Sequence, residues 1–466
     1  MKPEDLKGKK ITVIGLGLHG GSIGTVRFLC SAGAKVTVTD IKSKEELAIS
    51  IEKLKDLKNI SYILGQHRPE DFINADMVIK NPAVPWSNKY IKLALEKKIP
   101  VEMDSSLFFK FCKNSIIGVT GTKGKTTTAT LIYEILKTAK KNPIRAGVGQ
   151  VSVLDKIDDL KPESIVVFEL SSWRLSALGK NNLSPKIAVL TNVYPDHLNY
   201  YKSMEIYIRD KKNIFLNQKS GDFCVINWDD EVLNKLEPEI KSQIIKFSTS
   251  RISKGKSVFI HEGAIYLNDG IDEKKVMDIS EIQLKGKHNF SNILAGIGAA
   301  YALGITLTDI RKAISEFNGI PHRLELAREF EGIKYFNDTA ATQPESAIFG
   351  INSFEEPVIL ICGGADKNLD MAFLAKTIQE KVKGAIFLKG AATDKIISEI
   401  KKLLPKGEKD KNFTIVGSME KAVEMARASA EAGDVILLSP GAASFGLFNN
   451  EFDRGNKFKE AVNNLK

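Results

Sequence analysis

The stretch Ser115 to Thr128, SIIGVTGTKGKTTT, constrains the fold of this chain more than any other. Its apolar start, Ile116 to Val119, predicts a buried strand, and the following ATLIYEILKTAKK has helical spacing. Glycines in the loop between them let backbone N–H groups converge on phosphate oxygens beside the positive end of the helix. The order of strand, loop and helix therefore predicts a phosphate-binding loop, although Val119 stands where the strict pattern has its first glycine.

The residues of this loop have distinct expected tasks. We expect Lys125 to reach the β- and γ-phosphates of a nucleotide and the Thr126 hydroxyl to ligate magnesium. The predicted ATP-binding loop consists of Gly121, Thr122, Lys123, Gly124, Lys125, Thr126 and Thr127.

A second glycine-rich turn lies near the N-terminus, in KKITVIGLGLHGGSIGTVRFLCSAGAKVTVTD. Gly15, Gly17 and Gly20 satisfy G-x-G-x-x-G between a strand and a helix, and Asp40 ends the next strand. The start of a helix can bind a diphosphate, and an acidic side chain at the next strand end can hydrogen bond a ribose or base. Both NAD and a nucleotide-sugar carry these groups. The pattern leaves these two ligands open.

Strand and helix patterns alternate along the whole chain, which predicts an α/β protein with three sheets. We expect domains at residues 1–112, 113–319 and 320–466, with short joints near 112 and 319. The first and third read as Rossmann-like domains and the middle one as a P-loop ATPase-like parallel sheet. Between about Gly221 and Ile282 the short strands DFCVIN and SVFIHEGAIYL look antiparallel.

Polar residues at the ends of predicted strands of the middle domain mark candidate ligands. Glu169 ends SIVVFE and His197 follows KIAVLTNVYPD, where the strand ends of a doubly wound sheet gather around a nucleotide. Asn289 and Asn292 share one face of a helix. The basic side of the helix Tyr207 to Phe215 reads as a solvated face.

Composition is that of a globular protein, with 43% hydrophobic and 27% charged residues. The net charge of +10 comes from scattered lysines mixed with acids, so it does not indicate nucleic-acid binding. The four cysteines are far apart and form no zinc or disulfide pattern. The charged start, Met1 to Lys10, leads us to expect no signal peptide, and the most apolar run, Ile293 to Ile305, is too short to span a bilayer. We expect a cytoplasmic protein that binds neither nucleic acid nor membrane.

Taken together, the motifs GTKGKTT, ELSS, NVYPDH, GKHNFSN, GIPHRLE, NDTAAT, GGADKNLD and LSPGAASF resemble the Mur ligase family, which builds the peptide stem of peptidoglycan. The resemblance covers essentially the whole chain. The short first domain is most similar to the branch of the family that adds D-glutamate. The resemblance implies a monomeric ligase in which ATP phosphorylates the carboxylate of UDP-N-acetylmuramoyl-L-alanine and D-glutamate attacks the acyl phosphate.

The resemblance also implies roles for particular residues. Lys211, in the helix read above as a solvated face, matches a lysine that the family carries as a carbamate, an anionic ligand suited to Mg²⁺. It implies catalytic roles for Lys125, Glu169, His197 and Lys211, and metal ligation or orientation by Thr126, Glu169, His197 and Lys211. Beyond the loop, it implies ATP contacts from Asn292, His322, Arg323 and Asp338; a UDP-substrate site at Gly15, Gly17, Leu18, His19, Gly20 and Asp40; and a D-glutamate site at Thr342, Lys367 and Ser444.

Four positions depart from the pattern of the D-glutamate-adding branch. Ala340 stands where that branch often has lysine, and Glu451, beside Phe452, stands where an aromatic residue covers the amino acid. Gln150 stands near the position of an asparagine that meets the muramoyl group, and Lys42 stands where a small hydroxyl residue often helps to hold uracil. Two other activities therefore stay open: a Mur-type ligase that adds another acidic amino acid, and an NAD-dependent oxidoreductase built on Gly15 to Asp40. A nucleotide-binding switch or nucleic-acid-binding ATPase is a third alternative, which predicts salt-dependent binding to DNA or RNA.

Overall fold

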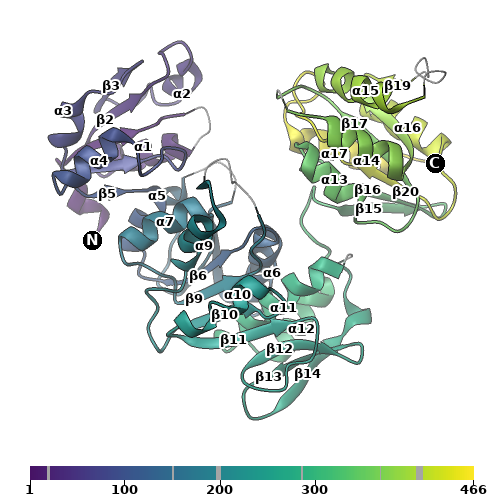
Figure 1. The fold of residues 1–466 in the computed structure, drawn as a ribbon, viewed down its shortest axis with the longest axis horizontal. Coiled ribbons are helices and arrows are strands. Elements are labelled where there is room, and N and C mark those ends of the chain that lie inside the picture. Colours follow the sequence, from purple (N-terminus) through teal and green to yellow (C-terminus); the bar gives the residue numbers. More distant parts are fainter. Residues whose placement is uncertain (18–20, 149–151, 196–200, 285–286, 368, 406–412) are drawn as a thin grey trace. The chain divides into compact units, whose positions relative to one another are not determined.

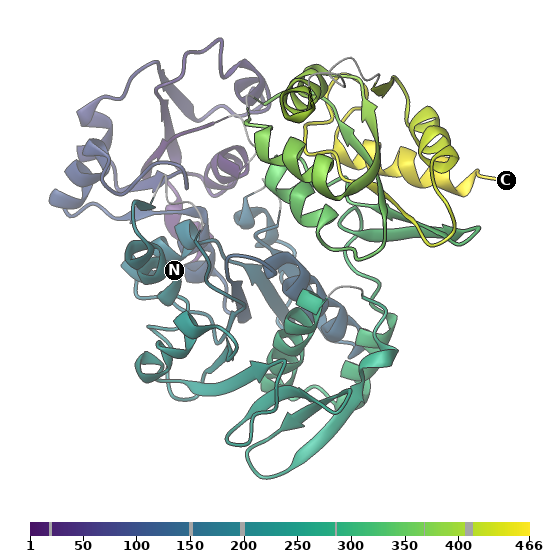
Figure 2. The same cartoon turned by 45° about the vertical axis from the view of Figure 1, so that its right-hand side comes forward.

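The computed structural model describes residues 1–17, 21–148, 152–195, 201–284, 287–367, 369–405 and 413–466. The chain divides into two compact units, Met1–Phe317 and Asn318–Lys466, and each is described by itself. Both are α/β in composition, with three sheets in all among the described residues (Figures 1 and 2).

The first sheet, at the purple end of the chain in Figure 1, has five parallel strands in the order β3-β2-β1-β4-β5. Its strands are β1 Lys10–Ile14, β2 Lys35–Asp40, β3 Ile60–Leu64, β4 Met77–Lys80 and β5 Val101–Glu102, and its helices are α1 Gly21–Ser31, α2 Ala48–Glu52, α3 Pro69–Ile73, α4 Lys89–Glu96 and α5 Asp104–Phe111. Four of the five residues of β1 are buried, as expected for a central strand covered on both faces. Because β1 and β4 are parallel neighbours, the glycine turn after β1 and the loop after β4 lie at the same edge of the sheet.

The second sheet has nine strands in the order β14-β13-β12-β11-β10-β9-β6-β8-β7. These are β6 Ser115–Thr120, β7 Asn142–Ala146, β8 Ser164–Glu169, β9 Ile187–Leu190, β10 Phe223–Asn227, β11 Gln243–Ser248, β12 Ser257–His261, β13 Ala264–Asn268 and β14 Glu273–Asp278. The phosphate-loop strand β6 lies between β8 and β9. Glu169 and the loop therefore belong to adjacent strand ends.

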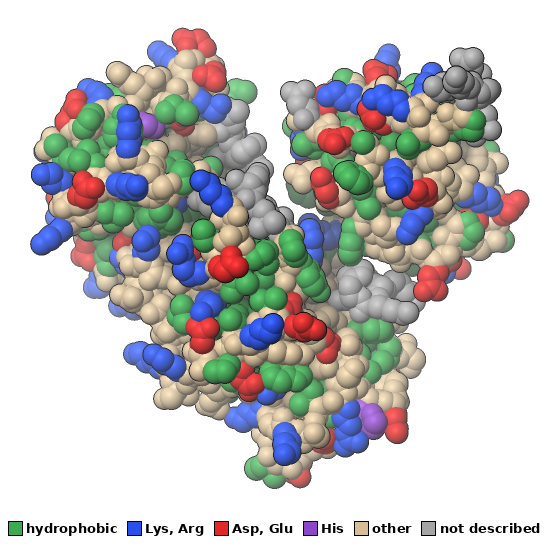
Figure 3. Space-filling model, in the orientation of Figure 1, with side chains coloured by type: hydrophobic (Ala, Val, Ile, Leu, Met, Phe, Trp, Pro, Cys, Tyr) green, Lys and Arg blue, Asp and Glu red, His purple; other side chains and the backbone are tan. Residues whose placement is uncertain are grey.

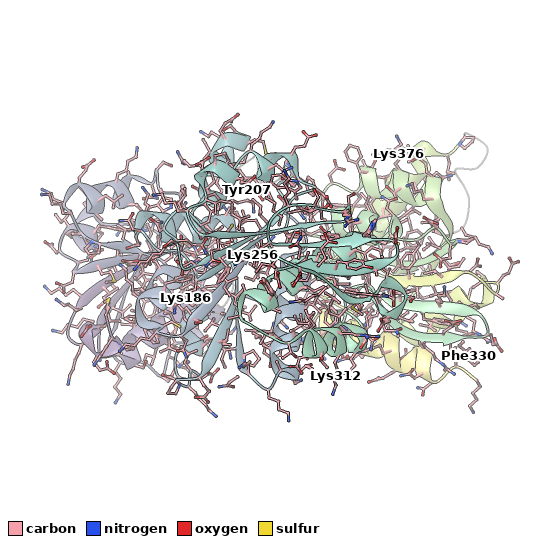
Figure 4. All side chains as sticks on the ribbon, turned by 90° about the horizontal axis from the view of Figure 1, so that it is seen from below. Lys186, Tyr207, Lys256, Lys312, Phe330 and Lys376 are labelled. Carbon is pink, nitrogen blue, oxygen red and sulfur yellow. The ribbon has the colours of Figure 1, made fainter. Side chains whose placement is uncertain are left out.

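Helices cover both faces of this second sheet: α6 Lys125–Thr138, α7 Ser172–Lys180, α9 Met204–Lys212, α10 Glu231–Asn234, α11 Lys287–Ala302 and α12 Leu307–Glu316. These helices form two packed groups. In one, α6 packs against α11 and α12; in the other, α7 packs against α9 and α5. Figure 4 labels Tyr207 on α9 and Lys312 on α12, which lie on opposite faces of the sheet. Ser203 begins α9 by accepting a hydrogen bond from the Ile206 amide, an N-cap that fixes where this helix starts.

One sequence expectation for this sheet is wrong in part. DFCVIN, expected to be antiparallel, forms β10, which pairs parallel with both β9 and β11. The antiparallel part is confined to β12, β13 and β14. The parallel pairing follows from the connection: α10 crosses over between β10 and β11, whereas β12 and β13 are joined by a tight turn at Glu262 and Gly263.

The second unit contains one six-stranded sheet in the order β15-β16-β20-β17-β18-β19. Its strands are β15 Glu325–Phe330, β16 Ile333–Asn337, β17 Val358–Gly363, β18 Val382–Leu388, β19 Thr414–Val416 and β20 Val435–Leu438; its helices are α13 Pro344–Ile351, α14 Ala372–Lys381, α15 Ala391–Leu403, α16 Met419–Ala428 and α17 Glu451–Asn463. The strands β16, β20, β17, β18 and β19 are parallel to one another. The edge strand β15 was not foreseen; it pairs antiparallel with β16 across the turn at Glu331 and Gly332.

Basic and acidic side chains are interspersed over the visible face of each unit in Figure 3. This mixture agrees with the reading of the +10 net charge as scattered surface lysines. Among the described residues, no helix combines the length and the apolar character that crossing a membrane requires.

Candidate active site

The phosphate loop joins β6 to α6, and two of its glycines are required by their surroundings. Gly124 immediately precedes α6 in a left-handed conformation, with φ 82°. A Cβ atom on Gly124 would lie 2.2 Å from Asn292 Oδ1, and one on Gly121 would lie 1.9 Å from Thr191 Oγ1. Any larger residue at these two positions would displace Asn292 or Thr191, so glycine keeps the backbone of the loop free for a phosphate group.

Lys125 is the first residue of α6, and its ammonium group lies over the loop. Its Nζ donates to the carbonyl oxygens of Gly121 and Thr122, each at 2.9 Å. The positive end of the α6 helix dipole and the Lys125 ammonium group therefore both make the potential at the loop more positive. That arrangement suits a bound polyphosphate.

Glu169 ends β8 directly beside the phosphate-loop strand. It is the pairing partner of Val119, and the next amide, that of Leu170, donates to the Val119 carbonyl at 2.9 Å. Its Oε2 atom is buried and accepts no hydrogen bond from any described residue. An ionised carboxylate oxygen in such a position is unfavourable unless a cation or donor is supplied, which suits a metal ligand.

The helix α9 brings Lys211 toward the same loop. Lys211 is 2% exposed, and its Nζ lies 4.6 Å from the centre of the Tyr207 ring. The Tyr207 hydroxyl is 3.2 Å from Thr122 Oγ1 of the phosphate loop (Figure 4 labels Tyr207). Lys211 is thus buried near the nucleotide loop, and the expectation that its helix presents a solvated face is wrong at this residue.

The remaining expected member of this group, His197, lies outside the described residues. Within the part of the chain that is described, no cluster of three or more His, Cys, Asp or Glu side chains forms a metal site.

Asn292 and Asn289, expected on one helix face, are hydrogen bonded to each other at 3.0 Å. Asn292 Oδ1 also faces the loop at Gly124, so the small-residue helix α11 supports the phosphate loop from behind.

A cavity of about 930 Å³ lies at the strand-end edge of the first sheet. Its walls include Gly15, Gly17, Asp40, Lys80 and Asn81 of the first domain and Gly147, Ser171, Trp173 and Arg174 of the middle one. The Asp40 carboxylate accepts hydrogen bonds from the Gly17 amide at 3.1 Å and the Lys42 amide at 3.0 Å. Leu18, His19 and Gly20, and also Gln150, lie outside the described residues.

Two wall residues of this cavity, Asp104 and Arg174, were not foreseen. They form an ion pair at 3.2 Å between α5 and α7, and Arg174 also donates to the Gly147 carbonyl at 3.0 Å. The one sequence signal was the arginine in SSWRL, directly after the polar strand end that carries Glu169. Through Ser171 and Arg174, the cavity approaches the residues that follow Glu169.

In the second unit, the loops of the three expected D-glutamate residues meet. Thr342, Lys367 and Ser444 follow β16, β17 and β20, which are neighbouring strands. The loops are tied by hydrogen bonds from the Gly441 amide to the Ala341 carbonyl at 2.8 Å and from the Ala365 amide to the Ala443 carbonyl at 3.0 Å. Lys367 is exposed and Ser444 is buried, so a flexible cation and a fixed hydroxyl border the same loop cluster.

Asp338 and His322 are buried in this unit, whereas Arg323 is exposed. Asp338 accepts from Ser439 Oγ at 2.7 Å and from the Leu324 amide at 3.2 Å, and burial raises the pKa of its carboxyl group to about 7. His322 Nδ1 lies 3.0 Å from Asn337 Nδ2, and burial lowers the pKa of its imidazole. The His322 ring lies edge-on to that of Phe452, at 5.6 Å between centroids.

Arg454 is a further residue that sequence reasoning missed. It is fully buried, and it donates from Nε to Thr339 Oγ1 at 2.9 Å, from Nη2 to the Thr339 carbonyl at 3.0 Å and from Nη1 to the Ala442 carbonyl at 3.2 Å. Burial lowers the pKa of its guanidinium to about 10. Arg454 thereby joins the loops after β16 and β20; an arginine on a C-terminal helix gives no sequence signal for such a task.

Three Mur ligase family models match the chain in consecutive stretches. They are the MurD-like N-terminal domain at residues 9–102, the Mur ligase middle domain at 119–300 and the Mur ligase glutamate ligase domain at 322–441.

Curated relatives match over nearly the full length. The UDP-N-acetylmuramoylalanine–D-glutamate ligase of Roseiflexus sp. is 39% identical over 464 residues, covering 98% of this chain and 99% of that protein. The proteins of the same name from Borreliella burgdorferi and Clostridioides difficile are 38% and 37% identical, each with 99% of this chain covered and with 99% and 100% of the relative covered, respectively.

Solved structures share the fold at lower identity. The UDP-N-acetylmuramate–alanine ligase MurC of Thermotoga maritima has a TM-score of 0.55 at 22% identity, over 98% of this chain and all of the other. The MurF ligase of Thermotoga maritima in complex with ADP has a TM-score of 0.53 at 18% identity, over 99% of each chain.

Proposed function

Because this chain belongs to the Mur ligase family, we propose that it joins D-glutamate to UDP-N-acetylmuramoyl-L-alanine with ATP, a step of peptidoglycan precursor synthesis. Relatives that bear this activity in their name share 36–39% identity with nearly the whole chain. The single structural observation that carries the chemistry is the phosphate loop, with the Lys125 ammonium above it and, on the adjacent strand end, a Glu169 oxygen to which no described residue donates a hydrogen bond.

The reaction has two steps. The γ-phosphoryl group of ATP passes to an oxygen of the substrate carboxylate, which gives an acyl phosphate and ADP. The amine of D-glutamate then attacks the carbonyl carbon, loses a proton, and the tetrahedral intermediate expels phosphate. Since the reacting groups are anions, the protein contributes chiefly by neutralising charge and holding the partners in line.

For ATP, the proposed contacts begin at the phosphate loop, residues 121–127. Lys125, now bonded to loop carbonyls, exchanges these for phosphate oxygens, and the start of α6 adds its dipole. Asn292, His322, Arg323 and Asp338 are the proposed contacts to adenine, ribose and phosphate. Burial of Asn292, His322 and Asp338 supports fixed recognition, whereas the exposed Arg323 is free to follow the phosphates.

The residues near the loop fit a hard divalent cation. Glu169 supplies a buried oxygen that no described donor occupies, and Thr126 supplies a hydroxyl at the loop. When bound, Mg²⁺ would neutralise charge on the phosphoryl and carboxylate oxygens. We propose Thr126, Glu169, His197 and a carbamylated Lys211 as the residues that hold or orient it. A carbamate on Lys211 would place an anion where the chain otherwise buries a cation beside Tyr207.

For the other two substrates, the cavity at Gly15, Gly17 and Asp40 is the proposed UDP site. It extends to Ser171 and Arg174, two and five residues beyond Glu169, which supports a substrate that runs from the nucleotide toward the metal. In the second unit, Thr342, Lys367 and Ser444 are proposed to bind D-glutamate, whose two carboxylates call for a cation and hydroxyls.

We propose the same residue ranges for the three domains as above: 1–112 for the UDP-substrate, 113–319 for ATP, and 320–466 for the amino acid and part of ATP. We also propose that the protein acts in the cytoplasm, as a monomer. All three substrates are soluble and charged, and each expected contact comes from this one chain, which supports both proposals.

Phosphate release from ATP tests this function. We would supply UDP-N-acetylmuramoyl-L-alanine, Mg²⁺ and bicarbonate, compare D-glutamate with D-aspartate, L-glutamate and L-lysine, and identify the product by mass. We expect release only with D-glutamate. Release with another amino acid would move the specificity within the family, in keeping with Ala340 and Glu451, and release with none would overturn the proposal.

A further inference from the structure

Lys80 is a buried lysine in the wall of the cavity at the strand-end edge of the first sheet. It is the last residue of β4 and pairs with Ile14, directly before the glycine turn that starts at Gly15. Its residue exposure is 2%, yet it borders the 930 Å³ cavity together with Asn81. A lysine at the end of a parallel strand in this type of sheet lies where ligands bind.

The partners of the Lys80 ammonium group are weak among the residues that the structure describes. Its Nζ lies 3.4 Å from the Asn81 carbonyl oxygen and 3.4 Å from Met103 Sδ, and 4.9 Å from the centre of the Trp86 ring. Among the described residues, no carboxylate forms an ion pair with it. The acids that attract it, Asp104 from α5 and Asp210 from α9, are each paired with an arginine.

Trp86 holds this cation in a fixed position. Its Nε1 donates to Ser176 Oγ at 2.8 Å, which fastens the ring to α7 of the middle domain. Lys180 on α7 places its own Nζ 5.2 Å from the same ring, but this lysine is exposed and is not part of the cavity wall. The two lysines therefore share one aromatic ring and differ in burial and in access to the cavity.

A buried ammonium without an anion is unfavourable, and the cavity is suited to an anion. Burial lowers the pKa of Lys80 to about 7, against the opposing attraction of Asp104 and Asp210. Near neutral pH about half of the molecules therefore carry this charge. An anionic group beside Nζ would favour the charged form and draw a proton from solvent.

We propose that Lys80 is an anion-binding residue of the substrate cavity that becomes fully protonated when the UDP-linked substrate binds. This inference rests on the proposed function and deepens it, because it assigns an additional cation to the substrate. The anion is either the diphosphate or the carboxylate at the sugar end, and both present oxygen acceptors to an ammonium group.

Calorimetric titration at pH 7.5, in two buffers that differ in ionisation enthalpy, measures the protons taken up on binding. Three ligands separate the two anions: UDP-N-acetylglucosamine carries the diphosphate alone, whereas UDP-N-acetylmuramate and UDP-N-acetylmuramoyl-L-alanine add a carboxylate. For the native protein with its full substrate, we expect uptake of more than half a proton. Uptake with all three ligands assigns the diphosphate, and uptake only with the last two assigns the carboxylate.

The variant Lys80→Met tests the residue, with Lys180→Met as the matched control on the same ring. We expect Lys80→Met to abolish proton uptake and to weaken substrate binding at least tenfold, with a melting temperature no lower than that of the native protein. Lys180→Met should retain both uptake and affinity. If Lys80 has only a structural role, Lys80→Met will have a lower melting temperature, and its affinity and proton uptake per folded molecule will be unchanged. That result would overturn the inference.

The two proposals fail in different ways. If the native protein binds UDP-N-acetylmuramoyl-L-alanine without proton uptake, and Lys80→Met binds it equally well, the role of Lys80 is wrong and the proposed function stands. If the native protein binds none of the three nucleotides, the proposed function fails together with this inference.

Discussion

The Asp104 carboxylate and the Arg174 guanidinium lie 3.2 Å apart, joining α5 to α7 with only 9% and 12% of their side chains exposed. Because removal of one partner leaves a buried charge unpaired, we expect Arg174→Met to lower the free energy of unfolding by about 3 kcal/mol. Chemical denaturation measures this loss. Arg27→Met, which breaks an ion pair to Asp56 that is 43% and 57% exposed, is the control and should change stability by less than about 1 kcal/mol.

Gly124→Ala should damage both the fold and ATP use. The backbone at Gly124 is left-handed and a Cβ atom would strike Asn292, whereas Gly8 has a similar φ of 76° with no atom within 4 Å of an added Cβ. Gly8→Ala therefore isolates the backbone strain, about 1–2 kcal/mol, and should leave activity intact. Gly124→Ala should in addition reduce ATP-dependent phosphate release by about 100-fold, since the loop must move. Equal activity of the two variants would contradict this account of the loop.

Glu169→Gln should separate catalysis from stability. The Glu169 Oε2 atom has no described hydrogen-bond partner, so a neutral amide costs the fold little. If Glu169 holds Mg²⁺, phosphate release should fall by roughly 100-fold or more and the Mg²⁺ dependence should shift to higher concentration, since even outer-shell partners of metals are worth about 10- to 100-fold. Glu134→Gln on the neighbouring α6, whose partner is the exposed Lys137, is a matched control that should behave as the native protein. An unshifted Mg²⁺ curve for Glu169→Gln would remove Glu169 from the metal site.

Asp338 should make stability depend on pH. Burial raises its pKa to about 7 in the folded protein, from an ordinary value of 3.8. Between these values the folded state holds a proton that the unfolded state has released, so the contribution of Asp338 to stability falls as pH rises from about 4 to 7, by at most about 4 kcal/mol. Asp338→Asn removes this dependence. The melting temperature of the variant relative to the native protein should therefore be higher at pH 7.5 than at pH 5, and a constant difference would contradict the buried, neutral acid.

Local sequence was sufficient where neighbouring residues along the chain decide the structure. The phosphate loop is one case, because glycines at 121 and 124, an apolar strand before them and a helix after them need no distant contact to be read. The glycine turn after β1 and the alternation of strands and helices that predicts three sheets were readable for the same reason. The resemblance to the Mur ligases was equally available, since motif order is a property of the chain alone.

Tertiary structure alone decided what depends on residues far apart in the chain. The basic helix face at Lys211 read as solvated, because a helical pattern does not show that this lysine is buried and lies beside the Tyr207 ring. DFCVIN read as antiparallel, because its pairing is set by the crossover through α10 and not by its own residues. Lys80 and Arg454 gave no pattern at all: a buried cation is defined by the desolvation and the acceptors around it, and these come from other strands and helices. Sequence thus determined where the glycine-rich loops lie, and folding decided which charged side chains are buried beside them.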